Sequence, residues 1–359
     1  MKIKWKLLYA LISTVAVSRP PLEAANSYIE TNLVSDLPGM AAQTDPNLVN
    51  PWGLAASASS PFWISNNHSG TSTLYNGAGQ PFPAAGPLVV QVPVPGSAQP
   101  PSAPTGVVFN DTTGFMLGGS AASFIFSSED GTITAWNGSA GGAAKLMVDN
   151  SGAGAVYKGL AIGVSPTSGP LLYATNFNAG TVDTFDANFS PIVTPGGFMD
   201  PNLPSGFAPF GIQRIGRKLF VSYAMQDSAR HDDVSGPGSG FVNVFDLDGN
   251  LAARVISGGK LNSPWGMTLS PAYFGDFGNV LLVGNFGDGT INAFDPWSGA
   301  YLGTLQDPSG NPIMITGLWA LQFGNNHNSA DSETLYFTAG IPGTGSPEDH
   351  GLFGSIQAQ

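Results

Sequence analysis

The sequence predicts an all-β protein, a six-bladed β-propeller with four-stranded blades. Three observations predict it: a glycine that recurs at nearly constant spacing, strand-like runs that follow each such glycine, and a composition rich in turn-forming residues. The glycines are separated by 53, 53, 52, 55 and 51 residues and lie at Gly53, Gly106, Gly159, Gly211, Gly266 and Gly317. A fixed period of this kind indicates one supersecondary unit that repeats, because no single copy can bury its apolar face alone.

The composition favours many short strands over helices. Only 10% of the residues are charged, and the chain contains 48 glycines and 29 prolines, as expected for strands joined by tight turns. The low charge does not indicate disorder, because hydrophobic residues make up 42% of the chain and leave enough surface to bury.

The first 25 residues have the pattern of a secretory signal peptide. Lys2, Lys4 and Lys6 form a basic segment, and the apolar run Leu7–Val17 is too short to span a bilayer. An uncleaved N-terminal anchor is the alternative. We expect residues 26–359 to form a single propeller domain that is secreted or periplasmic.

Charge and cysteine content exclude several classes of partner and site. The chain has no cysteine, so it has neither disulfides nor a thiolate nucleophile. Without residues 1–25, 8 basic and 23 acidic residues remain, a net charge of −15. Such a charge disfavours nucleic acid and anionic membranes through repulsion. We expect a monomer.

Each copy contains three strand-like runs after its glycine. In the fifth copy they are Trp265–Leu269, Val280–Gly284 and Thr290–Asp295. A four-residue offset marks the turn between the second and third runs, because Asn and Gly tolerate positive φ. This offset joins Asn66 to Gly70, Ser127 to Gly131, Asn176 to Gly180 and Asn285 to Gly289.

A fourth, outer strand is predicted in five copies, and the N-terminus supplies it for the sixth. The five outer strands are Leu88–Val94, Lys145–Val148, Pro191–Thr194, Leu251–Ile256 and Tyr301–Leu305. The last copy has none, whereas Tyr28–Ser35 precedes the first copy as an unassigned strand. We predict that it joins the last blade, which closes the ring and removes two exposed edges.

The repeat resembles the NHL-type six-bladed propellers. Asn50-Pro51-Trp52-Gly53-Leu54, Asp233–Gly238 and His350–Ile356 are similar to motifs of an uncharacterised family of exported bacterial propeller proteins. The resemblance covers roughly residues 28–356. It implies a propeller without an established activity.

Two long insertions break the regular pattern, after Tyr223 in the fourth copy and after Thr338 in the sixth. Both lie between second and third strands, so we expect them on one face of the ring. With the matching loop of the first copy they carry the candidate ligand-binding residues: His68, Asp227, Arg230, His231, Asp232, Asp233, Glu348, Asp349 and His350. The alternative is that these are solvated loop residues.

A divalent metal such as Ca²⁺ is a candidate cofactor at this face. Carboxylate and amide oxygens suit Ca²⁺ or Mg²⁺, and histidine shifts the preference towards Zn²⁺. The candidate ligands come from four blades and are Glu129, Asn176, Asp232 and Asn285. The asparagines have a second interpretation as caps of hairpin turns. Two interpretations also exist for three tryptophans, Trp52, Trp265 and Trp319. They could form a stacking platform for a flat ligand, but packing between blades is the preferred interpretation.

Two functions follow from this pattern. The first is a binding or scaffold module for an extracellular protein or glycan, with its ligand face formed by the second-to-third-strand loops. The second is a metal-dependent hydrolase or lyase that resembles the gluconolactonase-like or streptogramin-lyase-like propellers. We find no sequence motif for a catalytic residue.

Overall fold

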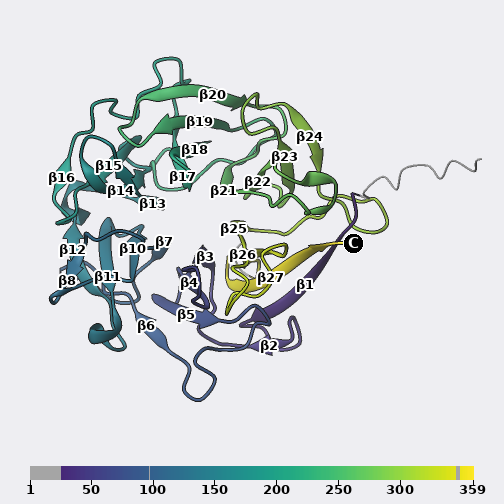
Figure 1. Ribbon diagram of the computed structural model, residues 1–359, viewed down its shortest axis with the longest axis horizontal. Helices are drawn as coiled ribbons and strands as arrows, with labels where there is room; N and C mark the ends of the chain where they lie inside the picture. The colour runs from purple at the N-terminus through teal and green to yellow at the C-terminus, as the bar shows by residue number, and fades with distance from the viewer. Residues whose placement is uncertain (1–25, 97, 345–347) are drawn as a thin grey trace, which may run out of the picture.

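The computed structural model describes residues 26–96, 98–344 and 348–359, and these form a closed ring of six blades (Figure 1). The predicted signal peptide, residues 1–25, lies outside the described residues. Each blade is an antiparallel sheet whose first strand lies nearest the channel. Apart from β1, which joins the last sheet, each blade is built from one continuous stretch of chain, so the blades follow one another around the ring in sequence order (Figure 1).

The first three blades each contain the expected four strands, and the outer strands of blades one and three are shorter than predicted. Blade one contains β3 (Pro51–Ala55), β4 (Phe62–Asn66), β5 (Thr71–Tyr75) and β6 (Val89–Gln91). Blade two contains β7 (Pro104–Phe109), β10 (Phe124–Ser128), β11 (Thr132–Trp136) and β12 (Lys145–Asp149), with a small ribbon of β8 (Met116–Leu117) and β9 (Ser120–Ala121). Blade three contains β13 (Tyr157–Ser165), β14 (Gly169–Asn176), β15 (Thr181–Phe185) and β16 (Pro191–Ile192).

The other three blades complete the ring. Blade four contains β17 (Phe207–Ile215), β18 (Lys218–Met225), β19 (Phe241–Asp246) and β20 (Leu251–Ser257). Blade five contains β21 (Pro264–Leu269), β22 (Leu281–Asn285), β23 (Ile291–Phe294) and β24 (Tyr301–Thr304). Blade six contains β25 (Leu318–Phe323), β26 (Leu335–Ile341), β27 (His350–Ala358) and β1 (Tyr28–Ser35), with β2 (Gln43–Thr44) parallel to β1.

Helix is confined to three single 3₁₀ turns within the described part of the chain, at Gly138–Ala140, Ser151–Ala153 and Gly275–Phe277. No helix there has the length and apolarity needed to cross a bilayer.

The N-terminal strand closes the ring as predicted, with the predicted bounds. β1 pairs antiparallel with β27, so that Tyr28 lies opposite Ala358 and Ser35 opposite Leu352. Asp36 then fixes the junction, because its carboxylate accepts the backbone N–H of Gly351 at 2.8 Å and contacts the His350 ring at 2.7 Å. The first and last segments of the propeller are therefore held by both sheet pairing and side-chain bonds.

The recurring glycines lie where the inner strands of adjacent blades touch. A Cβ on Gly53 would lie 2.8 Å from the backbone nitrogen of Val107, and one on Gly106 would lie 2.6 Å from that of Leu160. Neither backbone atom can move without displacing a whole strand, so only glycine fits these two positions. The glycine spacing therefore records where one blade meets the next.

The sixth equivalent position is Ala320, which corrects the sequence assignment of Gly317. The Ala320 N–H donates to Thr338 Oγ1 at 3.0 Å, as the Gly211 N–H donates to Ser222 Oγ at 2.9 Å. Gly317 lies three residues earlier, with a φ of +69°, and a Cβ there would collide with Gly340. The sequence prediction therefore took Gly317, a nearby glycine with a different role, for the sixth recurring position, which is occupied by Ala320.

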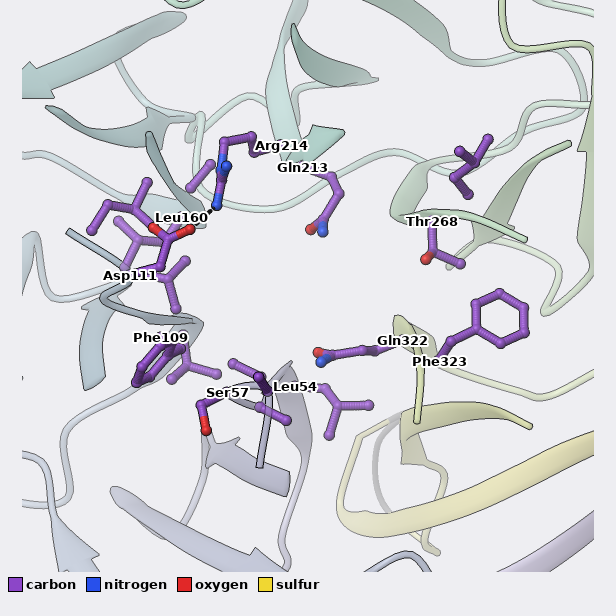
Figure 2. A pocket seen from close by; sticks show the side chains of 18 residues that line it. Leu54, Ser57, Phe109, Asp111, Leu160, Gln213, Arg214, Thr268, Gln322 and Phe323 are labelled. Atoms are coloured by element: carbon purple, nitrogen blue, oxygen red, sulfur yellow. Dashed lines mark hydrogen bonds and ion pairs between the residues drawn. The ribbon is translucent and has the colours of Figure 1, made fainter. Parts of the chain in front are cut away.

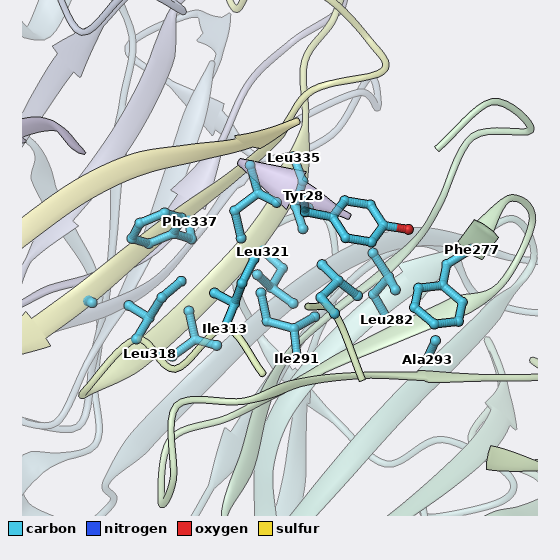
Figure 3. Close-up of a cluster of buried hydrophobic side chains, with 14 of the residues drawn as sticks. Tyr28, Phe277, Leu282, Ile291, Ala293, Ile313, Leu318, Leu321, Leu335 and Phe337 are labelled. Carbon is cyan, nitrogen blue, oxygen red and sulfur yellow. The ribbon is translucent and has the colours of Figure 1, made fainter. Parts of the chain in front are cut away.

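Apolar side chains fill the wedges between blades, and Tyr28 carries the closing strand into one of them. Figure 3 shows this wedge between blades five and six, with Tyr28 beside Leu282 and Leu335. Tyr28 is fully buried, its ring lies 4.9 Å from that of Phe274, and its hydroxyl donates to the Phe274 carbonyl at 3.2 Å. One side chain of β1 therefore ties blade six to blade five.

Tyr28→Ala is expected to destabilise the protein by about 3–5 kcal/mol, because it empties a filled aromatic site and leaves its neighbours without a partner. Ile29→Ala is the matched control, since Ile29 follows on the same strand and is 44% exposed. It should cost about 0.5 kcal/mol or less. Urea unfolding of both variants measures the difference, and equal losses would contradict the role given to Tyr28.

Candidate functional site

An aromatic layer blocks one end of the central channel. The residue before each recurring position is buried, and the six are Trp52, Thr105, Lys158, Phe210, Trp265 and Trp319. The rings of Trp52 and Trp319 stack with centroids 3.5 Å apart, and Trp265 meets both edge-on at 6.1 and 5.7 Å. All three tryptophans are buried, which agrees with the packing interpretation.

Lys158 replaces an aromatic residue in this layer, and its side chain is only 1% exposed. Its ammonium lies 5.1 Å from the centroid of Trp52 and 5.8 Å from that of Phe177, within the range of cation–π attraction. The ammonium forms an ion pair with Glu129 and a second one with Asp232 at 3.3 Å. Three blades thus contribute to one buried charge network.

The carboxylates decide the charge state of Lys158. Burial alone would lower the pKa of this amine, because it penalises the charged form. Glu129, and then Asp232, raise the pKa more strongly, so the net shift is upward and the ammonium stays charged. Asn67 holds Glu129 in place by donating from Nδ2 to Oε2 at 2.8 Å.

Glu348, in the second insertion, interacts electrostatically with Glu129, Lys158 and Asp232 of the same network. Burial is the main cause that raises the pKa of Glu348 to about 7, and the negative charge of Glu129 adds to it. The Asn50 side chain hydrogen-bonds the Glu348 carboxyl. The Oε1 atom of Glu348 is buried and has no hydrogen-bond partner among the described residues. The backbone of Glu348 has a φ of +76°, a conformation that costs on the order of 1–3 kcal/mol in a non-glycine residue.

The first insertion presents an exposed His–Asp pair above Lys158. His231 Nδ1 lies 3.0 Å from Asp232 Oδ1, and this contact raises the pKa of the imidazole and lowers that of the carboxyl to about 2. Asp227 organises the loop, because its Oδ1 accepts the backbone N–H groups of both residues. Arg230 is exposed at the tip, with a φ of +56°.

The remaining predicted ligand-binding residues lie in the loops around this centre and in the closing junction. Asp233 is bonded to Ser235 at 3.0 Å, and burial raises the pKa of its carboxyl. His68 is exposed in the β4–β5 turn, and Asp349 lies beside Gly343. His350 contacts Asp36 in the closing junction.

The two asparagines among the candidate metal ligands serve their own turns. Asn176 donates to Asp183 at 2.9 Å and accepts from Ala179, while its carbonyl caps the turn that ends at Gly180 with a φ of +72°. Asn285 donates to the Lys260 carbonyl at 2.7 Å and accepts from the Asn262 N–H. Neither amide meets the other two candidates, Glu129 and Asp232.

A different trio has metal-ligand types at close range. Glu129, His231 and Asp232 place one ligand atom each within 4.8 Å of one another. The ammonium of Lys158 already bonds both of these carboxylates. A divalent ion would therefore have to enter beside a fixed positive charge, which opposes its binding.

Lys158 was not among the site residues predicted from the sequence, although the repeat pattern contains a signal for it. The residue before the recurring position is aromatic in four of the six copies, and lysine is the single charged member of the series. A charge at a repeated buried position needs a partner. Comparing copies column by column would have marked it.

Lys158→Met is expected to destabilise the protein by about 3–5 kcal/mol, because it leaves Glu129 buried without its counter-charge. Lys145→Met, at an exposed position of β12, is the control and should change stability by about 0.5 kcal/mol or less. The double variant Lys158→Met/Glu129→Gln should be more stable than Lys158→Met alone. Urea unfolding tests this, and an additive loss in the double variant would contradict the pairing.

Glu348 predicts a pH dependence of stability. Since its pKa is higher in the folded protein, the folded state holds a proton that the unfolded chain releases between about pH 4.5 and about pH 7. The free energy of unfolding should therefore fall across this window, by about 2–3 kcal/mol relative to Glu348→Gln. Glu333→Gln, an exposed control, should retain the wild-type profile. Parallel profiles for wild type and Glu348→Gln would refute the assignment.

Comparison with solved structures supports the fold alone. The structure matches soluble aldose sugar dehydrogenase from Escherichia coli with a TM-score of 0.52 and 10% identity, covering 93% of this chain and 100% of that one. It matches virginiamycin B lyase from Staphylococcus aureus, solved with quinupristin, with a TM-score of 0.50 and 12% identity, covering 92% and 99%. Identities this low transfer no activity.

Comparison of sequences identifies relatives from a virus. No protein-family model matches the chain. It is 33% identical to the uncharacterized protein R648 of Acanthamoeba polyphaga mimivirus over 94% of this chain and 82% of that protein. It is 32% identical to the uncharacterized protein L690 of the same virus over 89% and 84%. These relatives do not support the bacterial origin expected from the motifs. The chain belongs to the protein family that includes these two uncharacterized mimivirus proteins.

Proposed function

We propose that this protein is an exported binding module that holds a protein with a basic surface segment on the face above Lys158. The observation that carries the proposal is the Lys158 network, in which side chains from several blades are fixed over a sealed channel. A rigid, pre-organised arrangement lowers the entropy cost of binding a partner. Export rests on the pattern of residues 1–25.

The charge of this face supports a basic partner. Its loops include the carboxylic residues Glu129, Asp130, Asp227, Asp232, Asp233, Asp288, Glu348 and Asp349, whereas their exposed cations are Arg230 and Lys260. Lys158 is buried and neutralised by its own pairs. An acidic surface attracts a basic partner and speeds its association.

The aromatic layer supports surface binding over a deep substrate cleft at this face. Trp52, Trp265 and Trp319 fill the channel directly beneath the network, so a ligand approaching from this side meets a closed floor. Exposed loops on a rigid scaffold are the usual place for protein recognition.

The second candidate is a metal-dependent hydrolase or lyase, favoured by the close approach of Glu129, His231 and Asp232. A bound divalent ion would supply Lewis-acid chemistry, and these three side chains would hold it. The ammonium of Lys158 between the carboxylates makes this candidate the weaker one.

Fluorescence anisotropy with a labelled lysine-rich peptide tests the binding proposal. Asp232→Asn/Glu348→Gln should weaken binding roughly tenfold, equivalent to about 1.4 kcal/mol, because two carboxylates are lost. Wild-type binding should tighten from about pH 6 to about pH 8, as Glu348 loses its proton next to Glu129, Asp232 and Lys158.

A charge-matched control variant separates binding at this face from unspecific electrostatic attraction. Asp276→Asn/Glu333→Gln removes the same charge from exposed positions in the loops of the opposite face. Equal weakening in both double variants would show unspecific attraction and contradict the proposal. Binding of a neutral glycan in place of the peptide would favour the glycan partner, and loss of binding in EDTA would favour the metal-dependent candidate.

A further inference from the structure

The opposite end of the central channel is open. A funnel of about 520 Å³ enters there between the inner strands, and we call this cavity the funnel. Residues from all six blades line it, and Figure 2 shows the side chains of Leu54, Phe109, Leu160, Gln213, Thr268 and Gln322 around the opening. Its volume lies within the range of small-molecule sites.

The funnel ends at the aromatic layer. A smaller cavity of about 40 Å³ adjoins it, shares Leu160 and Gln213 with it, and is also lined by Gly53, Gly106, Gly266 and Trp265. Because Trp265 belongs to the layer that seals the other face, the funnel and the Lys158 network are separate sites. A ligand in one does not reach the other.

Backbone groups contribute much of the funnel wall. Runs of consecutive residues line it, including 54–58, 107–109 and 160–162. Since neighbouring side chains of a strand point to opposite sides, what such a run shares with the cavity is its backbone. Each inner strand is also the edge of its sheet and leaves N–H and C=O groups unpaired towards the channel.

Two polar side chains in the funnel have no hydrogen-bond partner among the described residues. They are the Gln213 amide and the Thr268 hydroxyl, and Gln213 is exposed to the cavity. Gln322 is committed elsewhere: in the orientation that satisfies its amide, it donates to the Leu54 carbonyl at 2.7 Å and accepts from the Ala56 N–H. Figure 2 shows Gln213 and Gln322 reaching into the opening from opposite sides.

The charges of the funnel cancel. Asp111 and Arg214 are the charged residues of its lining, and they form an ion pair with each other. A charged ligand would therefore lose hydration without a free counter-charge to replace it. The guanidinium still has N–H donors that the pair with Asp111 does not use.

We propose that the funnel binds a neutral, polyhydroxylated small molecule of mono- or disaccharide size. Alternating backbone donors and acceptors, one free amide and one free hydroxyl match a ring of hydroxyl groups, each of which both donates and accepts. Leu269, which is 41% exposed, and the half-buried Phe109 offer apolar wall for the C–H faces of such a ring.

Saturation-transfer NMR and calorimetry with D-glucose and maltose test this proposal, with D-glucuronate and D-glucosamine as charged analogues. Wild type should bind at least one neutral saccharide and bind the charged analogues more weakly. Gln213→Ala/Thr268→Val should weaken that binding roughly tenfold or more, because two hydrogen bonds are lost. Thr268→Ser, which keeps the hydroxyl, should retain wild-type affinity.

Controls separate this site from the Lys158 face. Asp232→Asn/Glu348→Gln should leave saccharide binding unchanged, and Gln213→Ala/Thr268→Val should leave both the thermal melt and peptide binding unchanged. The proposal is overturned if wild type binds neither neutral saccharide, if the charged analogues bind more tightly, or if the Gln213/Thr268 variant binds as well as wild type.

Discussion

The close approach of neighbouring inner strands is the constraint on which the rest of this structure depends. At Gly53 and Gly106 no Cβ fits between one blade and the next. Hydroxyls of the second strands reinforce the contact, since Thr175 donates to the Phe210 carbonyl at 2.8 Å and Thr338 donates to that of Trp52 at 2.6 Å. These links set how tightly the ring closes, and the tight ring lets six side chains fill one end of the channel.

A ring closed in this way can carry a buried charge that an open sheet could not. Lys158 lies in an aromatic layer, where an unpaired ammonium would be severely penalised. Glu129 and Asp232 offset that cost from two other blades, so the charge stays only while the blades keep their positions. The same layer separates an acidic face from a funnel whose two charged residues pair with each other.

Sequence periodicity predicted most of the fold and only part of the candidate site. The closing strand Tyr28–Ser35 was predicted at its true bounds, because an apolar strand without a partner had one free edge to join. The sixth recurring position was missed, since Ala320 occupies it and Gly317 lies nearby. The predicted metal set failed to converge at Asn176 and Asn285, because these amides bond other partners, Asp183 and the Lys260 carbonyl, and such bonds are invisible when residues are chosen by type.

By itself, the sequence determined the number of blades, the order of strands, the turns and the way the ring closes, because each of these depends on local pattern and spacing. Only the tertiary structure decided which side chains meet. Lys158 lies 29 residues from Glu129 and 74 from Asp232, and no periodicity joins those positions. Their meeting depends on where two loops lie relative to the inner strand β13, and the packing of whole blades sets that placement.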